Sequence, residues 1–187
     1  LIVGLSAAGR LRAKREAAGT AGRPGQPNLE VAALIDAGFE TLGPECAGDP
    51  EAAELVFEEA LDLDEDAAHA YVGLALCSWC MGDPDQAFDD LDAAIETAPQ
   101  DPLPYFWRGR LWMEQEEGEE AYADLTQAIA LNPEYTEAYL WRAAVASWPL
   151  ENQDQAIKDL DKAIELEPKL PLPYLRRGEL AFWHCLL

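Results

Sequence analysis

Two cysteines separated by two residues, Cys77 and Cys80, form the pattern in this sequence that comes nearest to a reactive site. A thioredoxin-like dithiol needs such a pair at the start of a helix that follows a strand. This pair instead falls near the end of an apolar segment with helical spacing, and no strand pattern is found. A zinc site needs a second pair of ligands, whereas Cys46 and His184-Cys185 lie outside this segment. We therefore expect two small, half-buried thiols, and thiol redox or metal chemistry at Cys77 and Cys80 is the alternative.

The remaining polar groups do not form a catalytic pattern. His69 has no catalytic residue near it in sequence with which to form an active site, and the acidic run at 116–120 lies between two helical patterns, as expected of a solvated turn. The sequence contains no glycine-rich phosphate loop, no nucleophile elbow and no paired-histidine metal motif. We accordingly predict a protein with no catalytic residue, no bound metal and no cofactor.

The net charge of −23 is unevenly distributed along the 187 residues. Residues 1–27 carry five basic residues and one acidic residue, whereas the remainder carries eight basic and 35 acidic residues. An acidic body repels phosphate backbones, which excludes nucleic acid as its partner and favours a basic or apolar one. Four cysteines without a dense pairing pattern are typical of a reducing compartment, so we expect a cytoplasmic protein.

The first 27 residues read as a lead-in to the folded part. Nine mostly apolar or small residues precede a basic cluster in LIVGLSAAGRLRAKR. This pattern fits the end of a membrane anchor, the end of a signal peptide or an amphipathic lead-in. No run of eighteen apolar residues exists, so the sequence predicts no complete transmembrane helix. The stretch at 19–27, GTAGRPGQP, predicts a flexible linker, and we place the folded domain at 28–187.

Residues of the same type recur at a fixed interval through the folded part. Four tyrosines are spaced 34, 34 and 35 residues apart, and alanines and prolines repeat the same intervals. Asp49-Pro50 and Asp83-Pro84, also 34 residues apart, each predict a capped helix start, and Gln86 suits a capping box with Asp83. The recurring residues are Tyr71, Tyr105, Tyr139 and Tyr174; Ala53, Ala87, Ala121 and Ala156; Ala60, Ala94, Ala128 and Ala163; and Pro99, Pro133 and Pro168.

A helix–turn–helix unit of 34 residues with these fixed positions resembles the tetratricopeptide repeat family over residues 50–186. The resemblance implies an all-α, right-handed superhelical solenoid of stacked helix pairs. We place the pairs near 28–65, 66–99, 102–133 and 136–168, and a half repeat at 169–187. Because LAFWHCLL near the end is apolar on nearly every side, we expect either that the chain continues beyond Leu187 or that this helix docks on a partner or on another copy of the chain.

One departure from the family pattern concerns charge. Three pairs have Arg where the family usually has Leu, and two of them carry an Asp in the second helix. We interpret these residues as repeated structural ion pairs that join helix to helix. The alternative is a row of arginines that meets a ligand carboxylate. The proposed pairs are Arg108 with Asp124 and Arg142 with Asp159.

The resemblance also implies a ligand groove lined by the first helix of each pair. Some members clamp a carboxylate there. If the clamp began at the Tyr71 repeat, the corresponding positions would be Val72, Leu76, Trp107, Glu137 and Trp141, so the clamp is absent in that register. The groove positions implied by the resemblance are Val72, Leu76, Trp79, Phe106, Arg110, Leu140, Ala144 and Leu175.

These features predict a non-catalytic protein–protein interaction scaffold that binds a protein or peptide segment in an apolar, acid-rimmed groove. The alternatives are a membrane-tethered assembly factor with the same solenoid, and a thiol redox or metal protein.

Overall fold

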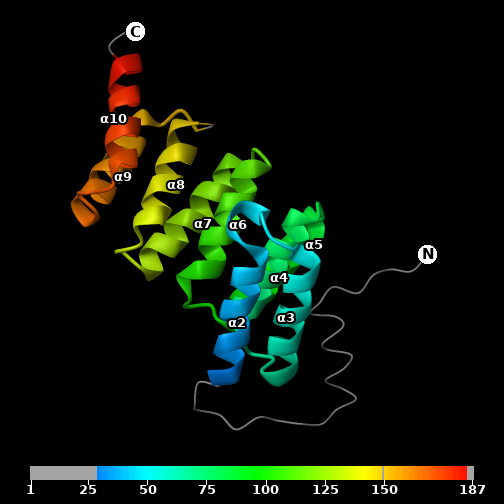
Figure 1. Cartoon of the computed structure of the whole chain (residues 1–187). Coiled ribbons are helices and arrows are strands. Elements are labelled where there is room, and N and C mark those ends of the chain that lie inside the picture. The colour runs from blue at the N-terminus through cyan, green and yellow to red at the C-terminus, as the bar shows by residue number, and fades with distance from the viewer. Residues whose placement is uncertain (1–28, 149, 185–187) are drawn as a thin grey trace. The chain divides into compact units, whose positions relative to one another are not determined.

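The computed structural model describes residues 29–148 and 150–184. In these ranges it contains nine α-helices, one 3₁₀ helix and no strand (Figure 1). The predicted lead-in, the linker and Cys185 lie outside the described residues. The helices are α2 (Leu29–Leu42), η1 (Pro44–Cys46), α3 (Pro50–Leu63), α4 (Ala68–Cys80), α5 (Pro84–Thr97), α6 (Pro102–Glu114), α7 (Gly118–Leu131), α8 (Thr136–Ser147), α9 (Gln153–Leu166) and α10 (Pro171–His184).

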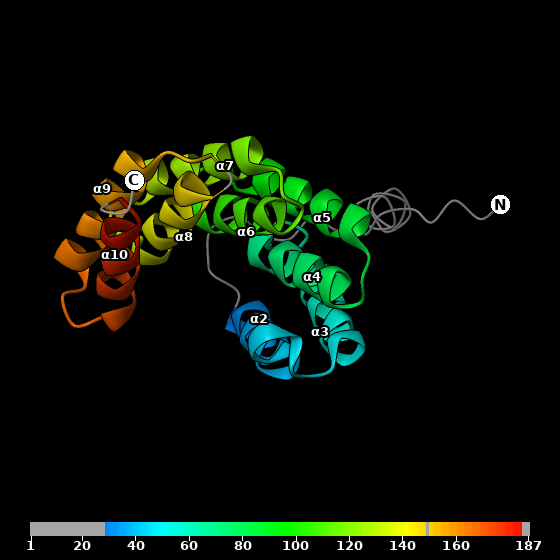
Figure 2. The same cartoon turned by 90° about the horizontal axis from the view of Figure 1, so that it is seen from above.

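The chain divides into two compact units, residues 1–100 and 101–187. In unit 1, α2 packs on α3 and α4 packs on α5; in unit 2, α6 packs on α7 and α8 on α9. Figure 2 shows α8, α9 and α10 following one another within unit 2. The predicted all-α class of stacked helix–turn–helix repeats is thus confirmed within each unit, whereas the division after Gln100 was not predicted.

Side chains just before the helices hold the first turns in place. The carboxylate of Asp49 accepts a hydrogen bond from Ala52 N at 3.0 Å, and that of Asp83 accepts one from Gln86 N at 3.2 Å. Each cap is followed by a proline, whose missing N–H costs nothing at this position. Only half of the predicted capping box forms: the backbone N–H of Asp83 donates to the carbonyl of Ser78 at 2.9 Å, and the Gln86 side chain donates forward to Asp90 Oδ1 at 2.9 Å.

The core of unit 1 is built around Phe57. This side chain has no exposed surface, and its ring lies 5.0 Å from that of Phe39 in an edge-to-face arrangement. The ring also fills the space in which side chains at Gly38 of α2 and Gly73 of α4 would lie. Two glycines therefore let three helices meet around one aromatic ring.

The recurring tyrosines have a distinct role in unit 2. The Tyr139 hydroxyl donates to the carbonyl of Pro133 at 3.3 Å, and the Tyr174 hydroxyl donates to that of Pro168 at 3.1 Å. Each tyrosine thus binds the proline that ends the preceding helix pair. This contact accounts for the recurring tyrosine, whose hydroxyl reaches the backbone carbonyl six residues before it.

We expect Gly73→Ala to lower the free energy of unfolding by about 1–3 kcal/mol, because the added methyl group would overlap the Phe57 ring. Urea unfolding followed by circular dichroism measures the change. Gly178→Ala is the matched control: outside the backbone of its own helix, no described atom lies within 4 Å of the position its Cβ would take, and alanine favours a helix over glycine by about 1 kcal/mol. Equal effects of the two substitutions would show that the Phe57 contact is not the constraint.

Candidate functional site

An arginine held between two tryptophans is the most distinctive surface feature of unit 2. The guanidinium carbon of Arg110 lies 4.5 Å from the ring centre of Trp107 and 4.4 Å from that of Trp141. All three side chains are half-buried. Such stacking is worth about 0.5–2 kcal/mol per contact and holds both rings in fixed orientations. We call Trp107, Arg110 and Trp141 the aromatic–arginine cluster.

Helix spacing and the repeat together produce this cluster. Trp107 and Arg110 are three residues apart on α6, so they share one face of that helix. Trp141 lies 34 residues after Trp107, at the same position of the next repeat, on α8. Because α6 contacts α8, the two indole rings face each other across the guanidinium.

Tyr135 connects the cluster to the core of unit 2. Its ring packs on Phe106 with 4.8 Å between ring centres. Burial raises the pKa of Tyr135 above its usual value, the charges of Glu137 and Asp101 raise it further, and the nearby charge of Arg110 lowers it. The phenol therefore stays neutral at physiological pH, and its ring links the cluster to the buried Phe106.

The structure distributes the predicted groove residues over three environments. Val72, Leu76 and Phe106 belong to the packed core, with exposed fractions of 0%, 9% and 6%, so their assignment to an open groove is corrected. The half-buried members are Trp79, Arg110, Leu140 and Ala144, and Leu175 is 60% exposed.

The reason for the correction in unit 1 lies in α4. Apolar residues cover this helix on all sides, and α2, α3 and α5 each pack against it. It therefore offers little open surface, although Trp79 near its end stays half-buried against Phe88, with 6.5 Å between ring centres. A first helix that is apolar all round is a core helix, and the family resemblance did not distinguish this case.

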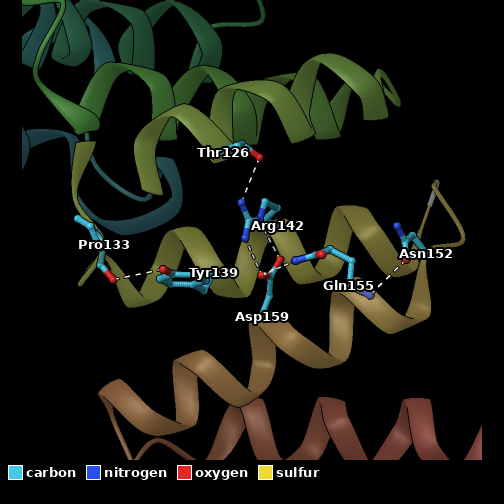
Figure 3. A network of polar contacts seen from close by, with 7 residues as sticks. All are labelled: Thr126, Pro133, Tyr139, Arg142, Asn152, Gln155 and Asp159. Atoms are coloured by element: carbon cyan, nitrogen blue, oxygen red, sulfur yellow. Dashed lines mark hydrogen bonds and ion pairs between the residues drawn. The ribbon is translucent and has the colours of Figure 1, made fainter. Parts of the chain in front are cut away.

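The two predicted ion pairs lie within hydrogen-bonding distance, each with two parallel bonds. Arg108 donates to both carboxylate oxygens of Asp124 at 2.7 and 2.8 Å. Arg142 donates to Asp159 at 2.7 and 2.9 Å and to the Thr126 hydroxyl at 3.1 Å (Figure 3). These pairs join α6 to α7 and α8 to α9. Both arginines therefore bind an aspartate of the same helix pair, as expected of structural ion pairs and not of a row of arginines that binds a ligand.

The network around Asp159 keeps a buried charge satisfied. Gln155 Nε2 also donates to its carboxylate at 3.0 Å (Figure 3). The guanidinium carbon of Arg142 lies 5.7 Å from the ring centre of Tyr139 and 5.5 Å from that of Tyr122. Burial alone would lower the pKa of Arg142, but the hydrogen bond and charge of Asp159 outweigh it, so the pKa lies above its usual value. The guanidinium consequently remains charged at every pH at which the protein is folded.

We expect Asp159→Ala to lower the free energy of unfolding by about 3 kcal/mol, because it leaves the mostly buried Arg142 without its counter-charge. Thermal or urea unfolding measures this. Asp161→Ala provides the control, since the pair between Asp161 and Arg177 is exposed, and it should change stability by less than about 1 kcal/mol. Similar losses in both variants would contradict a special role for the buried pair.

The cysteines are not arranged as the sequence suggested. Cys80 is bonded to Cys46 in a disulfide, and Cys77 is a buried free thiol. Burial raises the pKa of the Cys77 thiol to about 12, with smaller contributions from Glu54 and Asp90, so a reactive thiolate is not formed at neutral pH. Cys77 and Cys80 therefore do not act as a dithiol pair in this state.

Two further observations bear on the alternatives. Among the described residues no group of three or more His, Cys, Asp or Glu side chains is placed to hold a metal ion. In the same residues, none of the helices is both long enough and apolar enough to cross a membrane.

The antiparallel helix pairs, the tyrosine–proline contacts and the 34-residue interval define a helical-repeat protein. Models of the tetratricopeptide repeat match residues 47–102 and 136–170. This chain is a tetratricopeptide repeat protein. No curated protein matches its sequence.

Solved structures with the same fold include three informative examples. PilF of Pseudomonas aeruginosa has a TM-score of 0.76 and 23% identity, over 84% of this chain and 70% of that chain. MamA has a TM-score of 0.65 and 23% identity, over 74% and 80% of the two chains. The first TPR of Spaghetti (RPAP3), bound to the HSP90 peptide SRMEEVD, has a TM-score of 0.61 and 24% identity, over 65% and 96%.

Arg110 is one of the predicted groove residues, whereas its two tryptophan partners are not. In the sequence, Trp107 and Trp141 stand out only as positions of the carboxylate clamp. The signal for their contact was present, because the two residues occupy equivalent repeat positions and Arg110 follows one of them by three residues. The stacking distance itself depends on how closely α6 approaches α8.

Proposed function

We propose that this protein is a non-catalytic interaction scaffold that binds a basic and apolar segment of another protein. The observation that carries the proposal is the charge of unit 1. Residues 29–100 contain 19 acidic residues and no lysine or arginine. A surface of one sign attracts segments of the opposite sign and repels acidic ones, which supplies both association rate and selectivity.

The acidic groups of unit 1 are concentrated on the second helices of its pairs. Helix α4 contains no acidic residue. The negative charge expected around a groove therefore lies on α3 and α5 instead. The exposed carboxylates of α3 are Glu51, Glu58, Glu59 and Asp62, and those of α5 are Asp85, Asp89, Asp92 and Glu96.

The aromatic–arginine cluster of unit 2 is the proposed anchor point for the partner. Tryptophan and arginine are the residues that most often dominate the energy of protein interfaces. Here their orientations are already fixed by stacking, which reduces the entropy lost on binding. Half-buried rings also retain apolar surface that a partner side chain can cover.

The relative with a bound peptide supports binding as the mode of action and also shows a contrast. The peptide held by the first TPR of Spaghetti (RPAP3), SRMEEVD, contains three acidic residues. The present chain has a net charge of −23 and carries Trp107, Glu137 and Trp141 where a carboxylate clamp would place polar or basic residues. A basic, apolar ligand is therefore the better match to this chain.

A peptide library displayed on phage tests the proposal with the purified 187-residue chain as bait. We expect the enriched peptides to be rich in Lys, Arg and large apolar residues, and their binding to weaken as salt increases. Trp141→Ala should reduce the affinity for a selected peptide about tenfold or more, as measured by fluorescence anisotropy.

Trp148→Ala is the matched control for that measurement. Trp148 follows α8 and is 69% exposed, so its removal should leave both fold and peptide affinity unchanged. Enrichment of acidic peptides would contradict the charge argument. Unaltered affinity in the Trp141 variant would contradict the assignment of the anchor.

We also propose that α10 provides a second contact surface, through which two copies of the chain associate. Three large apolar side chains on this helix are exposed: Leu172 at 43%, Tyr174 at 43% and Leu175 at 60%. A Cβ added at the equivalent Gly109 on α6 would meet Leu125 of α7, whereas one added at Gly178 on α10 would meet nothing within 4 Å among the described residues outside its own helix backbone. An uncovered apolar helix face favours association.

Sedimentation equilibrium tests this second proposal. We expect the chain to self-associate at micromolar to tens-of-micromolar concentrations, and Leu175→Glu to shift it to monomer because a charge is then placed in the apolar contact. The control is Leu55→Glu on α3, a site that is 66% exposed, which should leave the association state unchanged. A wild-type chain that remains monomeric throughout this range would exclude association through α10.

A further inference from the structure

The described cysteines of unit 1 are placed so that two of them can be joined and the third cannot take part. Cys46 ends η1, the short helix after α2, and Cys80 is the last residue of α4. Their Cα atoms are 5.6 Å apart, within the range that disulfides require, and η1 contacts α4. The bond therefore joins elements that already pack together.

The backbone around Cys46 holds this residue in place. Cys46 has a φ of +61°, a left-handed conformation that is uncommon for a residue with a side chain. The turn is fixed by backbone hydrogen bonds from Ala47 N to Pro44 O at 3.0 Å and from Gly48 N to Leu42 O at 2.8 Å. Such a conformation persists where the surrounding structure determines it, and it is often associated with function.

Cys77 lies one helical turn before Cys80 but does not compete for the bond. It has no exposed surface, and its thiol is kept protonated by burial, so it cannot attack the disulfide between Cys46 and Cys80. Cys46, in contrast, is exposed and Cys80 is half-buried, so an oxidant can reach the pair that forms the bond.

We propose that the Cys46–Cys80 disulfide is formed in the functional protein and that the protein therefore works in an oxidising compartment. The bond forms by two thiol–disulfide exchanges with a disulfide oxidant, such as oxidised glutathione or an oxidoreductase. One cysteine thiolate attacks the oxidant and releases one thiol; the second then attacks the mixed disulfide and releases the other. The two protein thiols are oxidised, and one disulfide of the oxidant is reduced to two thiols.

This inference replaces the cytoplasmic location expected from the cysteine content. Disulfides persist in oxidising environments and are rare in the cytosol, where thiols are kept reduced. The inference goes beyond the proposed function, because a scaffold for basic segments is compatible with either compartment. The disulfide also links the first helix pair covalently to the second, since it closes a loop that contains α3 and α4.

The pairing is tested on the protein isolated from the cells that make it, after acid quenching and alkylation of free thiols. Chymotrypsin cleaves after Trp79 and so separates Cys77 from Cys80. We expect mass spectrometry to find Cys46 and Cys80 joined and Cys77 alkylated only after the chain is unfolded. Alkylation of Cys46 and Cys80 as free thiols, or a bond between Cys77 and Cys80, would overturn the proposal.

A thermal measurement on the purified chain provides the second readout. Addition of a reductant should lower the melting temperature by about 10 °C, because the loop closed by the bond is released. Cys46→Ser and Cys80→Ser should be insensitive to reductant, whereas Cys77→Ala should respond as the wild type does. Loss of the reductant response in Cys77→Ala, or its persistence in Cys46→Ser, would show that the proposed bond is not the one that stabilises the fold.

Discussion

The close approach of paired helices is the constraint on which the rest of this structure depends. Alanines at equivalent positions of the second helices, Ala53, Ala87, Ala121 and Ala156, have no exposed surface. Because these side chains are small, the backbones of a pair come near enough for side chains on one helix to reach those on the other. Both bidentate pairs, Arg108–Asp124 and Arg142–Asp159, rely on this spacing. A larger residue at Ala121 or Ala156 would separate the helices and break these ion pairs as well as the apolar contacts.

Charge is divided between the two units in a way that the shared fold does not require. The eight basic residues of 28–187 all lie in unit 2, where Arg108 and Arg142 serve buried ion pairs and Arg110 stacks between Trp107 and Trp141. Over residues 29–100, unit 1 contains acidic residues but no lysine or arginine. Helix pairs of the same kind thus display carboxylates in unit 1 and carry the aromatic–arginine cluster in unit 2. This division is the main physical basis for proposing a basic and apolar partner.

The first helix pair departs most from the repeat, and it carries the disulfide. Helix α2 has no counterpart in the recurring tyrosine pattern, and the turn after it contains both the 3₁₀ helix and the left-handed Cys46. Glycines at Gly38 and Gly73 admit the Phe57 ring between α2 and α4. A bond between Cys46 and Cys80 adds a covalent link at the other end of the same contact. The least regular pair is therefore held by packing and by covalent chemistry together.

The sequence by itself determined the repeat, the helix pairs, the capped starts at Asp49 and Asp83, and the partners of Arg108 and Arg142. These features depend on residue type at a fixed spacing, which a periodic fold converts directly into contacts. The tertiary structure alone decided three others. It buried Val72, Leu76 and Phe106, because exposure depends on how many neighbours pack around a helix and not on its position in the repeat. It placed Arg110 between two rings, because stacking depends on the distance between α6 and α8. It placed Cys46 beside Cys80, because the short helix η1 that ends at Cys46 packs against α4.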